Sequence, residues 1–328
     1  GDGDAIPDTI TQEVIDLALE CENAALDYDA RIVNSEGASV DLNSGLSIYG
    51  NSHGFLQAER KTRHGISCAV VAESNGNMQR DYWYDVSRNP DRLASARSIG
   101  IKAAQRTLRR LDARKLKTQQ APVLFSAELA RGIISSFTSA ISGSAQYRKA
   151  SFLLDALGEQ VFPDFMQLCE RPFLPQALAS ANFDAEGVAT RDNDLVKDGA
   201  IQSYLLDTYA ARKLGLRSTG HASGIHNLSV ASTGKSFEEC LAGMHRGLLV
   251  TELMGHGVNT VTGDYSRGAA GFWVENGKLD YAVEEVTIAA NLRDMFKGIV
   301  DIGTDIDYRG GIHCGSILIE NMTIAGVD

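Results

Sequence analysis

Glu252 and His256 stand four residues apart in "TELMGHG", the spacing at which a helix presents two side chains on one face. A carboxylate and an imidazole in that arrangement are typical of zinc hydrolases. A zinc-protease helix of that type carries two histidines, however, and the second one is missing here. The apolar run before Gly255 and Gly257 instead predicts a strand that breaks into a glycine loop. We therefore expect Glu252 and His256 to be structural or to face a substrate.

A second pair of metal-binding residue types is His313-Cys314. Thiolate and imidazole are both good zinc ligands, but neighbouring residues on a strand point to opposite faces. At most one of the two would face a given site. For Cys314, a small buried apolar side chain is the favoured interpretation, and a metal ligand is the alternative.

Two further segments have the composition of binding loops. His221, His226 and Asn227 lie in the Gly/Ser-rich stretch "STGHASGIHN", and loops of this kind often line clefts. Asp264 and Arg267 combine a carboxylate and a guanidinium in "TGDYSRG", which suits a peptide backbone or a carboxylate end. These five residues are the predicted peptide contacts. For the last two, an Asp264–Arg267 bridge that fixes a turn is an equally good interpretation.

Composition excludes several classes of function. A net charge of -11 disfavours direct binding to nucleic acid, and no apolar run reaches the roughly 20 residues that cross a bilayer. The five scattered cysteines encode neither a disulfide framework nor a cysteine-rich zinc module, and they fit a reducing compartment. Serine-hydrolase, P-loop and dinucleotide motifs are absent. We expect a soluble, cytoplasmic protein.

The elements that must position these residues fall into two unlike halves. Residues 1–117 predict an α/β domain in which a first helix, an antiparallel meander over about 31–87 and a second helix pack together. Residues 118–328 predict a β-rich domain, barrel-like or sandwich-like, with a few helices. Asp198-Gly199 and Asn276-Gly277 are hairpin signals within it. The predicted fold class is therefore α+β, with a domain boundary near Lys117.

Six blocks in the chain closely resemble the PmbA branch, also called TldE, of the TldD/PmbA family: "YGNSHGF", "RDYWYDVSR", "YRKASFLLDALG", "ARKLGLRSTGHASGIHN", "TELMGHGVNTVTGDYSRGAAGFWVENG" and "CGSILIENMTIAG". They occur in the family's order over nearly the whole chain. Family members carry a further N-terminal region, and this sequence opens in a loop-like stretch without an initiator Met. We therefore expect the natural chain to begin further upstream.

The resemblance implies a metallopeptidase system first named for modulation of DNA gyrase. In the TldD branch, a zinc helix with the pattern H-E-x-x-x-H works with a cysteine near the C-terminus. Aligning the block "YRKAS" with the family places Ser135 and Ala140 at the two histidine positions and Ser136 at the glutamate position. None of these side chains can replace its counterpart in a zinc site. Cys314 matches the cysteine ligand and is left as a remnant.

The resemblance also implies partners and a substrate class. We expect a subunit without its own metal or catalytic residues, paired with a zinc-containing TldD-like chain, that acts on extended or unfolded peptides in precursor maturation or antitoxin degradation. In isolation it would form a homodimer. Whether the chain is itself an enzyme stays open. The alternatives are a non-proteolytic homodimer that binds peptides or modulates gyrase, and a hydrolase with Cys314 as nucleophile.

Overall fold

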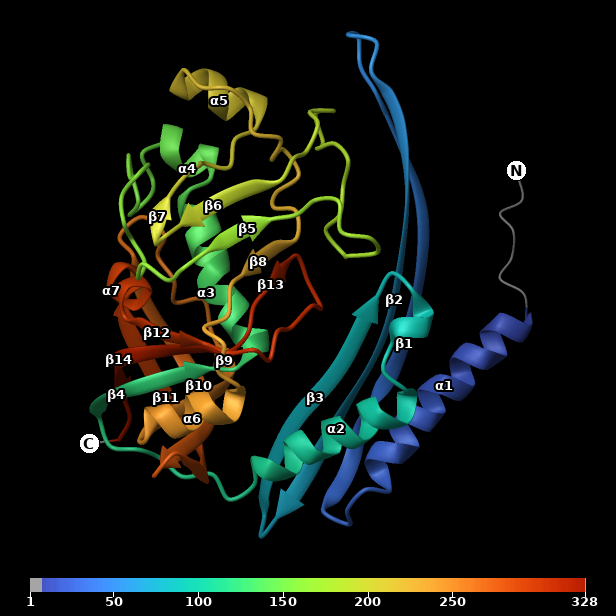
Figure 1. Ribbon diagram of the computed structural model, residues 1–328. Helices are drawn as coiled ribbons and strands as arrows, with labels where there is room; N and C mark the ends of the chain where they lie inside the picture. Colours follow the sequence, from blue (N-terminus) through green and yellow to red (C-terminus); the bar gives the residue numbers. More distant parts are fainter. Residues whose placement is uncertain (1–7, 328) are drawn as a thin grey trace. The chain divides into compact units, whose positions relative to one another are not determined.

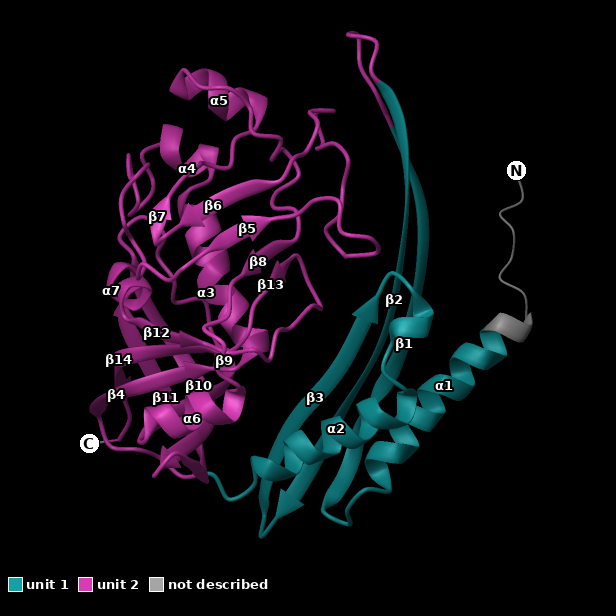
Figure 2. Ribbon diagram, viewed as in Figure 1, with its two compact units in different colours: residues 1–48, 56–113 teal, residues 49–55, 114–328 magenta. Residues whose placement is uncertain are grey.

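The computed structural model describes residues 8–327, with side chains from residue 11 onward. These described residues divide into two compact units, residues 8–48 with 56–113 and residues 49–55 with 114–327 (Figure 2). No helix in this described part of the chain has the length and apolar character needed to cross a membrane. The α+β class predicted from the sequence is confirmed, and each unit is described separately below.

The first unit is an antiparallel meander with helices on one face (Figure 1). Its sheet has the order β1-β2-β3, and its elements are α1 (Asp8–Leu26), β1 (Ile32–Gly50), β2 (Leu56–Ser74), β3 (Asn77–Ser87), the 3-10 turn η1 (Pro90–Arg92) and α2 (Ala96–Arg109). Asn75 and Gly76 both adopt positive φ between β2 and β3, as a two-residue hairpin turn requires. Side chains of β2 alternate, and Ile66, Cys68 and Val70 are buried with α1 and α2 residues in one apolar cluster.

The second unit contains a closed barrel. Pairing of β11 with β14 closes the order β11-β10-β9-β4-β14 on itself, and β12 extends the sheet from β14. These strands are β4 (Gln119–Phe125), β9 (Gly247–Met254), β10 (Asp264–Glu275), β11 (Lys278–Asn291), β12 (Ile299–Ile302) and β14 (Ile317–Ala325). All neighbours are antiparallel except β4 and β9, which are parallel. Closure removes the free edges that an open sheet would present.

A smaller sheet lies in the same unit, with the order β13-β8-β5-β6-β7. Its strands are β5 (Leu168–Glu170), β6 (Asn193–Lys197), β7 (Ala200–Ile201), β8 (Leu228–Val230) and β13 (Ile312–His313). The helices of the unit are α3 (Ala127–Ala140), α4 (Gly143–Tyr147), α5 (Thr208–Leu214), α6 (Phe237–Met244) and α7 (Leu292–Lys297). The two hairpins predicted at Asp198-Gly199 and Asn276-Gly277 are confirmed, because they join β6 to β7 and β10 to β11 with positive φ.

Helix α3 is held between the two sheets of this unit by its apolar face. Ile133, Ile134 and Phe137 are almost completely buried, and Phe137 packs edge-to-face on Phe162 at 5.0 Å between ring centroids. The opposite face of the helix carries small polar residues. The helix thus has one fixed orientation, which determines where the positions expected to bear zinc ligands point.

Candidate functional site

The helix expected to carry the zinc motif presents no metal ligand at the three motif positions. Ser135 is exposed and Ser136 is half-buried, with its hydroxyl donating to the carbonyl oxygen of Gly132 at 3.0 Å. Ala140 is fully buried in the apolar core at the last turn. An imidazole at position 140 would have to displace core side chains, and a hydroxyl bonded back to its own helix is not a zinc ligand.

The cysteine counterpart lies in an equally unsuitable environment. Cys314 is fully buried, and its thiol donates to the carbonyl oxygen of Gly315 at 3.1 Å. Burial, followed by the charges of Asp305 and Asp307, raises the pKa of this thiol well above its usual range. Because zinc and nucleophilic chemistry both use the thiolate, this environment suppresses both. The adjacent His313 is also buried, and that burial lowers its pKa.

The carboxylate of Asp307, which pairs with Cys314 through the backbone, is neutralised by arginines. Asp307 pairs across an antiparallel bridge with Cys314, and its carboxylate accepts hydrogen bonds from the Arg309 guanidinium at 2.9 and 3.0 Å. Arg131, one turn before Ser135 on α3, approaches the same carboxylate at 3.8 Å. Burial alone would raise the pKa of Asp307, but Arg309 and Arg131 lower it overall. Two guanidinium groups here oppose a bound cation.

These donors therefore do not fit a catalytic zinc ion. Two serines, an alanine and a buried thiol take the four positions that the family resemblance assigns to the motif, and arginines hold the neighbouring carboxylate. Within residues 8–327, no group of three or more His, Cys, Asp or Glu side chains is placed to hold a metal ion. We derive no metal-dependent step for this chain.

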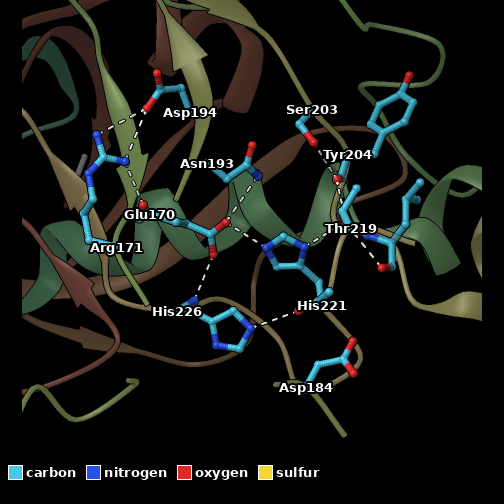
Figure 3. A network of polar contacts seen from close by, with 12 residues as sticks. Glu170, Arg171, Asp184, Asn193, Asp194, Ser203, Tyr204, Thr219, His221 and His226 are labelled. Atoms are coloured by element: carbon cyan, nitrogen blue, oxygen red, sulfur yellow. Dashed lines mark hydrogen bonds and ion pairs between the residues drawn. The ribbon is translucent and has the colours of Figure 1, made fainter. Parts of the chain in front are cut away.

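Two of the predicted peptide contacts, His221 and His226, form a buried polar network with a residue that the sequence did not single out (Figure 3), and Asn227 is buried beside them. Glu170, at the end of β5, is only 1% exposed. One of its carboxylate oxygens lies 2.7 Å from His221 Nε2, and the other accepts the backbone N–H of His226 at 2.8 Å. Asn227 donates from its side chain to the Arg171 carbonyl oxygen and to Ser180 Oγ. The network fastens the loop after α5 to β5.

The order hydroxyl, imidazole, carboxylate within this network resembles a hydrolytic triad. Thr219 Oγ1 lies 2.7 Å from His221 Nδ1, on the side of the ring opposite Glu170. Yet Thr219 Oγ1 also accepts the N–H of Leu206 at 2.7 Å, and the His221 side chain is only 3% exposed. A nucleophile must be open to its substrate. We therefore assign Thr219, His221 and Glu170 a structural role, while contact of His221, His226 and Asn227 with peptide stays a prediction.

Asp264 and Arg267 lie on a strand, so the prediction that they share a binding loop was wrong. β10 begins at Asp264, and residues three apart on a strand point to opposite faces. Asp264 is exposed and accepts from the Thr262 hydroxyl at 2.6 Å. Arg267 lies near Tyr265, whose burial raises its pKa to about 12. Both Asp264 and Arg267 stay predicted peptide contacts.

Glu252 and His256 do not converge. Glu252 lies in β9 opposite Ala270, whereas His256 is exposed beyond the end of the strand, after Gly255 with its positive φ. The predicted strand that breaks into a glycine loop is confirmed. Sequence reasoning missed Glu170, Arg131 and Asp307, because their partners are distant in sequence or in unpatterned loops.

Comparisons with known proteins agree with this geometry. Residues 4–111 match the central domain, and residues 118–326 the C-terminal domain, of PmbA/TldA metallopeptidases. The chain belongs to the PmbA/TldA metallopeptidase family. It is 52% identical to metalloprotease PmbA of Escherichia coli O157:H7 over 96% of this chain and 70% of that protein. It is 48% identical to the PmbA homologue of Haemophilus influenzae over 97% of this chain and 71% of that protein.

Solved structures of relatives share the whole fold. A candidate modulator of DNA gyrase from Bacteroides thetaiotaomicron is 30% identical, with a TM-score of 0.92 over 97% of this chain and 72% of that one. A second candidate modulator of DNA gyrase, from Thermotoga maritima, is 29% identical, with a TM-score of 0.89 over 96% of this chain and 74% of that one. TldE from Thermococcus kodakarensis, at 22% identity and a TM-score of 0.84 over 99% and 77%, shows the same fold. The family membership expected from the sequence is thereby confirmed.

Proposed function

We propose that this chain is a PmbA/TldE-type subunit of a zinc metallopeptidase system and lacks a zinc site of its own. The observation that carries the proposal is the replacement of the motif by Ser135, Ser136 and Ala140 on a helix that is otherwise intact. The buried Cys314 supports it, because a raised pKa leaves little thiolate to bind metal. The zinc ion and the catalytic glutamate belong to a TldD-like partner, and the substrates are extended or unfolded peptides.

The test measures cleavage of a reduced, carboxymethylated protein substrate by this chain, by the TldD-like protein of the same organism, and by their mixture. We expect cleavage to need the TldD-like protein, to be stimulated by this chain, and to stop with a chelator. A mixture in which the partner's motif glutamate is replaced by glutamine serves as the control and should be inactive. Chelator-sensitive cleavage by this chain alone would overturn the proposal.

A second candidate function is non-proteolytic regulation by a homodimer. The names of the Bacteroides and Thermotoga structures, both candidate modulators of DNA gyrase, favour it. It predicts full function without a TldD-like protein. A supercoiling assay with purified gyrase, this chain and no partner separates the two. A change in gyrase activity without the partner, combined with no stimulation of cleavage in the mixture, would favour regulation.

A cysteine hydrolase is the third candidate, and the geometry argues against it. The Cys314 thiol is fully buried, donates to a carbonyl oxygen and has a raised pKa. A hydrolase of this class would keep its activity under chelation and lose it in Cys314→Ala. We expect the opposite pattern for the mixture with the TldD-like protein, in which Cys314→Ala retains cleavage and a chelator abolishes it.

A further inference from the structure

The face of the three-stranded sheet opposite α1 and α2 carries a row of small residues. Along β2, Ile66, Cys68 and Val70 point toward the helices, so the alternate residues point the other way. These are Gly65, Ser67 and Ala69. On β3, Tyr84 stands opposite Ser67 and Tyr82 stands opposite Ala69. The small side chains of the central strand therefore leave a depression in this face, and the tyrosines of β3 border it.

This arrangement leaves a hollow of about 370 Å³ within the first unit. A hollow of this size lies in the range of ligand-binding pockets. The Tyr82 and Tyr84 rings are stacked at 6.2 Å between centroids, and Tyr82 is 49% exposed. The hollow is lined by Asp41, Arg63, Gly65, Ile66, Ser67, Tyr82, Tyr84, Asp85 and Val86.

The fold does not require a glycine at position 65. It lies within the central strand, where glycine is less favourable than residues with a side chain. It does not adopt positive φ, and a Cβ atom there would meet nothing closer than Asp41 Oδ2 at 3.7 Å, an ordinary contact. Any side chain would fill the hollow. A glycine inside a strand often marks the close approach of a ligand or another backbone.

Two charged side chains border the hollow without partners. Among the side chains that the structure describes, neither Asp41 nor Arg63 makes an ion pair or a hydrogen bond. A guanidinium donates and a carboxylate accepts, which complements the C=O and N–H groups of a peptide backbone. Tyrosine and arginine are also the residue types enriched where proteins bind peptides and other proteins.

We propose that this hollow is a peptide-binding site in which an extended segment crosses β2 and places one large apolar or aromatic side chain over Gly65. Arg63 and Asp41 hold the backbone of that segment, and Tyr82 and Tyr84 form the wall beside its side chain. Because backbone groups and a single side chain are recognised, the site selects extended peptide and tolerates varied sequence. This inference rests on the proposed function, since it names where that peptide substrate is held.

The test is Gly65→Val with a short fluorescein-labelled peptide, amidated at its C-terminus, that has one central phenylalanine among serines and threonines. Fluorescence anisotropy gives the Kd. Loss of a buried large apolar side chain costs about 1.5–3 kcal/mol, which corresponds to binding weaker by about tenfold or more. We expect that loss in Gly65→Val, and also when the peptide's phenylalanine is replaced by glycine.

Matched variants of the same sheet control the experiment. Gly45→Val makes the same change on β1, outside the hollow, where a Cβ atom meets nothing within 4 Å. Arg63→Gln removes the guanidinium that holds the peptide backbone and should weaken binding. Its control is Arg60→Gln, because Arg60 is exposed on the same strand and does not line the hollow. Both controls should bind peptide as the parent protein does. Circular dichroism should show Gly65→Val folded, since the added side chain enters open space.

The possible results separate the two proposals. If the parent protein and its mixture with the TldD-like protein both fail to bind or cleave unfolded peptide, the proposed function itself is overturned. If the parent binds the peptide and Gly65→Val binds it equally well, only the site assignment is wrong. If Gly65→Val instead turns a dimer into a monomer while peptide binding persists, the face accommodates a second copy of the chain, and the assignment is again overturned.

Discussion

Two sets of polar side chains, one in each unit, differ in burial and in pairing. In the second unit, Glu170, His221 and Asp307 are buried and paired, so they contribute to stability. In the first unit, Asp41 and Arg63 border an open hollow and hydrogen-bond to no described side chain. Pairing and burial distinguish residues that hold the fold from residues free to meet a ligand, although both kinds look alike in the sequence.

The strongest test of this contrast is Glu170→Gln. The substitution removes a buried negative charge that accepts from His221 and from the His226 backbone, and leaves those donors badly matched. We expect the free energy of unfolding to fall by about 3 kcal/mol. Trp273, buried in the second unit, reports the transition in a Trp83→Phe background. An effect below about 1 kcal/mol would contradict the structural role.

Asp307→Asn should lower the free energy of unfolding by a smaller amount that depends on pH. The arginines hold the pKa of Asp307 below its ordinary 3.8, so the folded state favours the carboxylate. That contribution is present above the unfolded pKa and is lost as pH falls through the lower folded pKa. We expect a loss of about 2 kcal/mol at neutral pH that shrinks below pH 3.8. A difference between the two proteins that does not change with pH would contradict this assignment.

Gly65→Val should increase the free energy of unfolding, whereas the two preceding substitutions decrease it. A β-branched residue in a central strand, whose Cβ atom would make only ordinary van der Waals contacts, should raise the stability of the first unit by about 0.5–1 kcal/mol. Urea unfolding followed by Trp83 fluorescence in a Trp273→Phe background measures it. A loss of stability would show that the fold needs glycine here, which would remove the argument that the space serves a ligand.

The smallest effect is expected for His256→Ala. His256 is exposed beyond β9, and surface substitutions of this kind usually change stability by less than about 0.5 kcal/mol. The same Trp273 measurement applies. A loss above about 2 kcal/mol would show that Glu252 and His256 act together after all.

Local patterns predicted the fold better than the site. The hairpins at Asp198-Gly199 and Asn276-Gly277 and the strand ending at Met254 depend on neighbouring residues, and the sequence could identify them. Barrel closure through β11 and β14, and the ion pair between Arg131 and Asp307, join positions far apart in the chain. No spacing rule reports such contacts. The hollow at Gly65 depends on which face of β2 each residue occupies, which only the assembled sheet reveals.

Zinc binding by this chain itself tests most directly whether the chain lacks a zinc site. Atomic emission after dialysis against excess zinc, with the TldD-like protein as the positive control, gives the metal content of each chain. We expect stoichiometric zinc in the TldD-like protein and none in this chain, with no change in Cys314→Ala. One zinc ion per chain here, lost in Cys314→Ala, would show that this chain has a zinc site of its own.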